Sequence, residues 1–243
     1  TNGRQYPSSV HGTLTIALDR VINGDKERGI APCPEAQAVM SLAANLAADA
    51  MPLSLLDRLD VPEIGASDAV AALLEVSLIS LSRTKSGAPA ATTHRLVQRA
   101  MMDRLSANDQ ADNALEIAIE VLDGAFPLSQ ETSWIECEDF EPHMRVVCDT
   151  AMARDVRTSL FASLAAQLGF YSVMRARLEG VEPLLMKAIA CYREKGGELE
   201  AHYGLATNCL GTYLLAKGRV NEAKEAFESG LEIFKRVLGD EHF

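Results

Sequence analysis

The sequence predicts an all-α protein with one small β-hairpin, built as a helical domain followed by a superhelix of paired-helix repeats. Three observations lead to this prediction. Apolar residues recur at helical spacing along most of the 243 residues. One stretch, Leu78–Ser82, alternates with the period of two that is typical of a strand. Near the C-terminal end, one segment repeats the preceding segment at a fixed offset.

Helical spacing and the residues that interrupt it define the N-terminal helices. Pro34 suits the first turn of a helix, because no intrahelical donor is lost there. Ser67 can accept the hydrogen bond that caps another helix. The helices are expected over residues 13–23, 34–47, 53–59, 67–76 and 94–105.

A hairpin separates the last two of these helices. Its first strand is Leu78–Ser82, its turn signal is Ser86-Gly87-Ala88-Pro89, and its second extended stretch is 91–93. Several helices, a hairpin and a further helix are the layout of a winged-helix domain. We therefore predict a winged-helix-like domain at residues 1–107.

Residues 108–153 are expected to form a helical connector. A helix over 111–122 should end at Gly124, and a further helix is expected around 143–153. The acidic residues at 136–141 are interpreted as a solvated corner between these helices. The stretch has no Gly/Ser-rich or Pro-rich run, which favours helices over a flexible linker.

Residues 154–243 contain two copies of one pattern. A shift of 42 residues places Leu210-Gly211 on Leu168-Gly169, Tyr213 on Tyr171, and Phe227 on Leu185. Small residues recur where two helices approach closely, and large residues recur where the space between helices is filled. The order Leu210-Gly211, Gly218, Ala223, Phe227, Gly230 resembles a tetratricopeptide repeat. The alternative is an ordinary pair of helical hairpins with accidental similarity.

The long period is similar to that of kinesin-light-chain repeats. The run over residues 236–242 resembles the start of a further copy. We therefore expect that the chain is a fragment and that its array continues.

The first helix of each pair should line the concave side of the array. The residues expected there are Leu205, Asn208, Thr212 and Leu215 in the second copy, and Ser163, Ala166, Phe170 and Val173 in the first. Asn208 resembles an asparagine that in kinesin-light-chain-like repeats binds the backbone of an extended peptide, since an amide both donates and accepts. The alternative is that Asn208 bonds the neighbouring helix.

Motifs over nearly the whole chain resemble one family. They are Tyr6-Pro7-x-x-Val10, Met51-Pro52-x-x-Leu55-Leu56, Leu73-Leu74 with Ser77-Leu78-Ile79, His94-Arg95-Leu96-Val97-Gln98, and Trp134-x-x-Cys137 with Pro142-His143. In this order they resemble the region between the nucleotide-binding core and the repeats of bacterial NB-ARC and tetratricopeptide proteins. These are signal-transduction ATPases with numerous domains, the STAND class.

This resemblance implies a role for His94. In related switch ATPases, a Met-His-Asp motif of the winged-helix domain places its histidine on the β-phosphate of bound ADP, and His94 aligns with that histidine. Thr93 and Arg95 replace the Met and the Asp, so the usual acidic contact between domains is in doubt. From the residues alone, a histidine where a hairpin ends and a helix begins can donate a ring N–H to an anion. The alternative is that His94 only caps and packs this junction.

Composition and missing motifs argue against several functions. The formal net charge of −11 disfavours binding to nucleic acid. We find neither a membrane-spanning apolar stretch nor a signal peptide. The five cysteines are odd in number and widely spaced, which argues against disulfides and a zinc site and favours a reducing, cytoplasmic location. No phosphate-binding loop, H-E-x-x-H or G-x-S-x-G occurs, so we expect no catalytic site, metal or cofactor in this chain.

The hypothesis from the sequence is a non-catalytic regulatory fragment of a nucleotide-switched signalling ATPase. The winged-helix part would act as a lid on a nucleotide-binding domain that lies outside this chain and binds ATP or ADP. The repeats would bind a protein or peptide partner. The alternative is a stand-alone repeat scaffold with an N-terminal helical cap.

Overall fold

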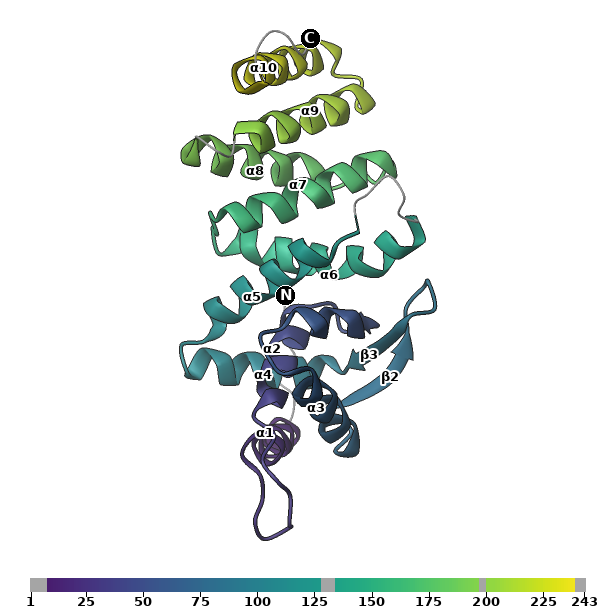
Figure 1. Ribbon diagram of the computed structural model, residues 1–243, viewed down its shortest axis with the longest axis vertical. Helices are drawn as coiled ribbons and strands as arrows, with labels where there is room; N and C mark the ends of the chain where they lie inside the picture. The colour runs from purple at the N-terminus through teal and green to yellow at the C-terminus, as the bar shows by residue number, and fades with distance from the viewer. Residues whose placement is uncertain (1–7, 128–133, 197–199, 239–243) are drawn as a thin grey trace. The chain divides into compact units, whose positions relative to one another are not determined.

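The computed structural model describes residues 8–127, 134–196 and 200–238, and it is mainly helical (Figure 1). The chain divides into two compact units, Thr1–Val147 and Cys148–Phe243. The predicted all-α class with a small sheet is confirmed. Within the described ranges, no helix has the length and apolar character needed to span a membrane. The predicted domain limits at residues 107 and 153 stay predictions, as does the winged-helix assignment.

Helix α2 (Glu35–Asn45) lies at the centre of the first unit. It packs against α1 (Ser8–Asn23), α3 (Glu63–Glu75), α4 (Arg95–Ala107) and α5 (Ala111–Ala125). Its side chains Val39, Met40 and Leu42 are almost wholly buried, and each such burial contributes about 1.5–3 kcal/mol. The helix can be covered on so many sides because its residues are mostly alanine and other apolar types.

Several boundaries in the first unit differ from the predicted ones. Helix α1 begins at Ser8, and α3 begins directly after Pro62, so Ser67 lies inside α3 and does not cap it. Gly124 does not end α5, which continues to Ala125. A short 3-10 helix, η1 (Leu53–Arg58), replaces the predicted helix over 53–59. Local propensity alone does not set these ends, because packing against neighbours extends helices beyond their signals.

The sheet has three strands, β1 (Met51–Pro52), β2 (Ile79–Arg83) and β3 (Pro89–Thr93), in the order β1-β3-β2. The predicted hairpin pairs antiparallel in the register Ile79↔Thr93 to Arg83↔Pro89. The two-residue strand β1, which the sequence did not predict, pairs with the other edge of β3. Two residues are too few to show a period in the sequence.

Helix α6 (Trp134–Ala153) contains the acidic residues that were predicted to form a solvated corner, and that prediction is wrong. Asp139 and Glu141 are more than nine-tenths buried. Asp139 accepts hydrogen bonds from the backbone N–H of Ser86, at 3.1 Å, and from its hydroxyl. A ring nitrogen of His143 lies 3.3 Å from the carbonyl oxygen of Ala50. These polar contacts hold α6 on the hairpin loop and on the residue that precedes β1.

The second unit stacks α7 (Ser159–Met174), α8 (Val181–Lys195), α9 (Glu200–Ala216) and α10 (Val220–Leu238) as two helical pairs (Figure 1). Each helix packs against the next, and α7 also packs against α9. Pro183 lies in the first turn of α8, where no intrahelical donor is lost. Residues 239–242, in the run that resembles a further copy, lie outside the described residues, and so do Tyr6 and Pro7.

One contact recurs at the predicted offset of 42 residues. A Cβ atom at Gly169 would lie 2.5 Å from the Leu185 side chain, and a Cβ atom at Gly211 would lie 2.7 Å from the ring of Phe227. In both pairs a glycine of the first helix therefore receives a large residue of the second. This equivalence supports the alignment of the two copies on geometric grounds.

Candidate functional site

The second unit carries an exposed face on the first helices of its two pairs, which we call the α7–α9 face. It consists of Ser163, Gln167, Phe170 and Met174 on α7, and Leu205, Asn208, Thr212 and Leu215 on α9. The apolar members are between two-fifths and three-fifths exposed, from 42% for Phe170 to 59% for Leu205. The opposite side of α9 is buried, and its residues Cys209, Leu210 and Tyr213 share one core cluster with Leu185.

One residue predicted for this face, Val173, does not lie on it. Val173 is only 9% exposed, because it packs in the core cluster with residues of α8 and α9. Its neighbour Met174 is exposed instead. Ala166 is partly exposed, as Ser163, Gln167 and Asn208 of the face are. Leu215, at the position equivalent to Val173, is 52% exposed because it belongs to the last helical pair that the structure describes.

The side chain of Asn208 lies against helix α10. A Cβ atom at Gly230 would overlap Oδ1 of Asn208, so the amide lies directly against the glycine backbone. The equivalent residues of the first copy are Ala166 and Ala188. Asparagine thus contacts glycine in one copy, whereas both equivalent positions of the other copy hold alanine. This compensation favours the structural role for Asn208, and the peptide contact stays a prediction.

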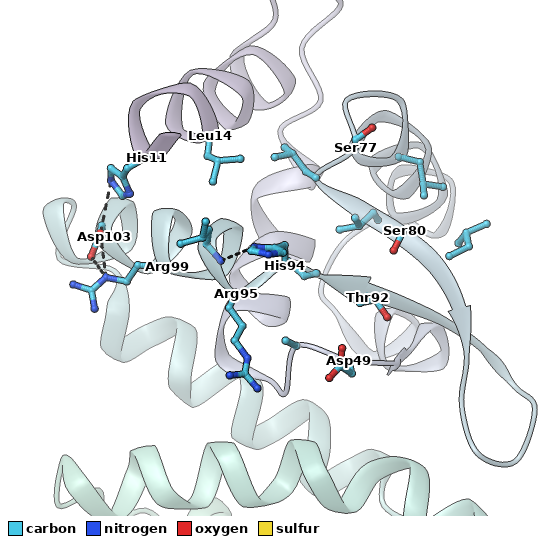
Figure 2. Close-up of a pocket in the computed structure, with 17 residues that line it drawn as sticks. His11, Leu14, Asp49, Ser77, Ser80, Thr92, His94, Arg95, Arg99 and Asp103 are labelled. Atoms are coloured by element: carbon cyan, nitrogen blue, oxygen red, sulfur yellow. Dashed lines mark hydrogen bonds and ion pairs between the residues drawn. The ribbon is translucent and has the colours of Figure 1, made fainter. Parts of the chain in front are cut away.

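The first unit has an open cavity of about 1440 Å³ that contains His94 (Figure 2). Its lining comes from α1, the loop after α2, the end of α3 and the turn after it, both strands of the hairpin, and α4. His94 lies where β3 ends and α4 begins, as the sequence predicted. Leu14, Leu78 and Leu96 form part of an apolar wall, and Leu81 on the edge strand is 63% exposed.

The side chain of His94 caps helix α4. Its Nδ1 accepts a hydrogen bond of 3.2 Å from the backbone N–H of Leu96 (Figure 2). A neutral imidazole that accepts through Nδ1 carries its proton on Nε2. The cap therefore leaves one ring N–H as a donor on an exposed side chain that lines the cavity. The capping role and the anion-binding role are compatible, since they use different ring nitrogens.

Charged side chains surround His94 in this cavity. Nε of Arg99 lies 2.9 Å from Oδ1 of Asp103, and Nε2 of His11 lies 3.7 Å from the other oxygen of that carboxylate. Arg95 is exposed beside His94 and has no ion-pair partner among the residues that the structure describes. Residue 95 is therefore positively charged, whereas the Met-His-Asp motif of the related switch ATPases has an aspartate at this position.

Burial strongly shifts the pKa values of two side chains outside these sites, His143 and Cys209. Burial lowers the pKa of His143 to about 4, and its Nδ1 has no hydrogen-bond partner within the described ranges. Burial also raises the pKa of the Cys209 thiol to about 12, which makes this cysteine a poor nucleophile. Within residues 8–127, 134–196 and 200–238, no group of three or more His, Cys, Asp or Glu side chains could hold a metal ion.

Comparison with family models matches residues 205–243 to the family described as "Tetratricopeptide repeat". The match includes Leu205, Asn208, Thr212 and Leu215 of the α7–α9 face, and it supports the prediction for the second copy. Comparison with curated proteins found no match. Comparison with solved structures found none. Tetratricopeptide repeats bind protein partners, so the match supports a role in protein interaction.

Proposed function

We propose that this chain is a protein-interaction module whose second unit binds a partner protein through the α7–α9 face. The observation that carries the proposal is the exposure of Phe170, Met174 and Leu205 on neighbouring helices. Phe170 and Met174 lie one turn apart on α7, and neighbouring exposed apolar residues of this kind are typical of an interaction site. The tetratricopeptide match, which includes Leu205, supports the same role.

Photo-crosslinking tests this role. A photoreactive phenylalanine analogue placed at Phe170 should crosslink a protein from a lysate of the source cells. The same analogue at Met186, which is 51% exposed on α8, serves as the control. The product at Phe170 should disappear when Leu205→Glu is added. Equal crosslinking at both positions, or a product insensitive to Leu205→Glu, would count against the proposal.

The first unit is proposed to regulate this interaction by responding to a nucleotide. The proposal follows from the family resemblance, and it is supported by the Nε2–H that the cap of α4 leaves at the edge of an open cavity. A nucleotide-binding domain of the same protein would present ADP to this edge. The backbone N–H groups of Leu96, Val97 and Gln98 are already hydrogen-bonded to His94. The ring N–H of His94 and the backbone N–H of Arg95 would therefore contact the phosphate.

Two substitutions separate the capping role of His94 from its proposed phosphate contact. Asparagine is a strong helix cap but has no donor at the position of Nε2. In a protein that includes the nucleotide-binding domain, His94→Asn should weaken ADP retention by the ~1–3 kcal/mol typical of coupling between sites. The melting temperature should change little. His94→Ala should lower both ADP retention and the melting temperature. Unchanged ADP affinity in His94→Asn would show that His94 has only the capping role.

The second candidate is a repeat scaffold in which the first unit only caps the array. The family match supports this scaffold as much as it supports the nucleotide-regulated module, because the match covers only residues of the repeats. Calorimetry on a protein with the nucleotide-binding domain distinguishes the candidates. Partner affinity that is equal with ADP and with ATP would favour the scaffold. For this chain alone, both candidates predict no binding of either nucleotide at micromolar concentration.

A further inference from the structure

Strand β2 is an open edge of the three-stranded sheet in the first unit. The order β1-β3-β2 gives it one neighbour, β3, and Figure 2 shows the loop residue Asp49, Thr92 of β3 and Ser80 of β2 in this order across the sheet. The sequence of β2, Ile79-Ser80-Leu81-Ser82-Arg83, contains neither lysine nor proline, the residues that commonly protect an edge from pairing. Leu81, at its centre, is 63% exposed. The edge is therefore available to another strand.

The hydrogen bonds of the hairpin show which main-chain groups lie on this free edge. The N–H of Thr84 donates to the carbonyl oxygen of Ala88 at 3.0 Å, in the same register as the rest of the hairpin. Bonded pairs alternate with non-bonded pairs in an antiparallel ladder, so the residues of β2 that bond β3 are Ser80 and Ser82. The N–H and C=O groups that point away from β3 belong to the other three residues of the strand, Ile79, Leu81 and Arg83.

The other side of β3 agrees with this alternation. The N–H of Thr93 donates to the carbonyl oxygen of Ala48 at 2.9 Å, so the main chain of Thr93 bonds away from β2. Thr93 lies opposite Ile79 in the hairpin, and Ile79 therefore also directs its main-chain groups away from β3. The same holds for Leu81 and Arg83, which follow at intervals of two residues. No strand that the structure describes pairs with this edge.

We propose that two copies of this chain associate through their β2 strands, which pair antiparallel about a two-fold axis at Leu81. In this register Leu81 pairs with Leu81 of the second copy, and Ile79 pairs with its Arg83. The main-chain groups that these residues direct to the free edge bond across the axis. The exposed Leu81 side chains pack against each other, and the two sheets become one. This pairing goes beyond the proposed function, because it uses the first unit and not the α7–α9 face.

The sequence of β2 favours a second copy over an unrelated strand. Ser80-Leu81-Ser82 reads the same in both directions, so the proposed register places hydroxyl against hydroxyl and leucine against leucine. The strand has no acidic residue, and its one charged residue, Arg83, lies at opposite ends of the paired strands, where the two guanidinium groups do not meet. A two-fold interface requires a self-complementary surface of this kind.

The dimer is expected to be weak and to depend on salt. A five-residue strand buries less area than a standard interface, so the dimer forms at high concentration. The first unit also carries nearly all of the net charge of −11, and two such units repel each other. Salt screens this repulsion and should therefore strengthen the association.

Sedimentation velocity on the full chain tests the pairing. The sedimentation coefficient should rise between about 1 µM and about 1 mM protein, the range of weak association, and it should rise further in high salt. Leu81→Lys should abolish the rise, because it places two like charges at the axis. Leu205→Lys changes a leucine of similar exposure, 59%, on the α7–α9 face and should leave the rise unchanged.

A mixture of two variants tests the register. Leu81→Lys and Leu81→Glu should each remain monomeric alone, and both should keep the melting temperature of the parent, since the side chain is exposed. An equimolar mixture of the two should associate again, because the introduced lysine then faces the introduced glutamate. In the parent, hydrogen exchange of the Leu81 amide should slow about twofold at the concentration where half of the chains are paired. The Ser82 amide, which already bonds β3, should change little.

Three results would overturn the inference. The first is a parent chain that stays monomeric over the whole concentration range. The second is association that Leu205→Lys abolishes and Leu81→Lys does not, which would place the second copy on the α7–α9 face. The third is a mixture of the two Leu81 variants that does not associate, which would show that Leu81 does not lie at the two-fold axis.

Discussion

At the scale of single residues, His143 shows how burial sets a chemical property. Its side chain is 1% exposed in the first unit, and burial lowers its pKa to about 4, although the carboxylates of Asp139 and Asp49 favour the charged form. The unfolded chain binds the proton with the ordinary pKa of about 6.5. The folded unit therefore prefers neutral His143, and protonation favours unfolding.

The sign of the pH dependence follows from this lowered pKa. The stability that neutral His143 allows is fully present above pH 6.5 and is lost as the pH falls toward 4. Between pH 7.5 and pH 5 the free energy of unfolding of the first unit should fall by about 2 kcal/mol from this group. Urea titrations that are followed by the fluorescence of Trp134 measure this free energy at each pH. His143→Gln keeps a donor for Ala50, and a pH profile in this variant as steep as in the parent would contradict the assignment.

Asn208 and Gly230 are expected to be energetically coupled. A methyl group at Gly230 would overlap the amide of Asn208, so Gly230→Ala alone should destabilise the second unit by about 1–2 kcal/mol. In the Asn208→Ala background the same change should stabilise it by up to about 1 kcal/mol, since alanine is the better helix former. The double variant recreates the Ala166 and Ala188 pair of the first copy.

A double-mutant cycle in urea measures this coupling. Additive effects of the two substitutions would show that the side chain of Asn208 leaves α10 in solution. That result would restore the peptide contact as the better explanation of Asn208.

At the scale of elements, the buried carboxylate of Asp139 joins α6 to the loop of the hairpin. Removing it leaves the backbone N–H of Ser86 without its acceptor, so Asp139→Ala should destabilise the first unit by about 1–3 kcal/mol. Protection of the Ser86 amide against hydrogen exchange should fall as well. The control is Lys85→Ala, which removes the exposed partner of Glu138 and should cost less than about 1 kcal/mol. Equal losses in the two variants would mean that Asp139 does not anchor the loop.

The recurring glycine contacts show how the repeat specifies its own packing. Gly169 and Gly211 let a large side chain of the second helix approach the first helix in each pair. The spacing of small and large residues therefore indicates which residues of paired helices are in contact, and this spacing is visible in the sequence alone. The spacing of small and large residues does not show what packs on the outer side of α10, the last helix that the structure describes.

At the scale of the whole molecule, the charge is distributed unevenly. The net charge is −11, and nearly all of the acidic excess lies in the unit Thr1–Val147. Self-repulsion of like charges destabilises a compact state, and salt screens it. The first unit should therefore be stabilised by salt, whereas the second unit should respond little.

Thermal unfolding with two probes tests this difference. Tryptophan fluorescence reports the first unit, because Trp134 is the only tryptophan, whereas far-ultraviolet circular dichroism reports both units. Raising the salt concentration should raise the melting temperature seen by Trp134 by a few degrees and change the remaining transition little. Equal shifts in both signals would show that the acidic excess does not destabilise the first unit.

The sequence by itself determined the helical class, the hairpin with its turn, the position of His94 at the start of α4, and the offset of the two repeat copies. These features depend on period, on turn residues and on the spacing of small and large side chains, all of which are local. Only the tertiary structure decided the burial of Val173, the direction of Asn208, the third strand β1 and the burial of Asp139. Each of these depends on a neighbour distant in the sequence, because a side chain is exposed or buried according to what packs against it.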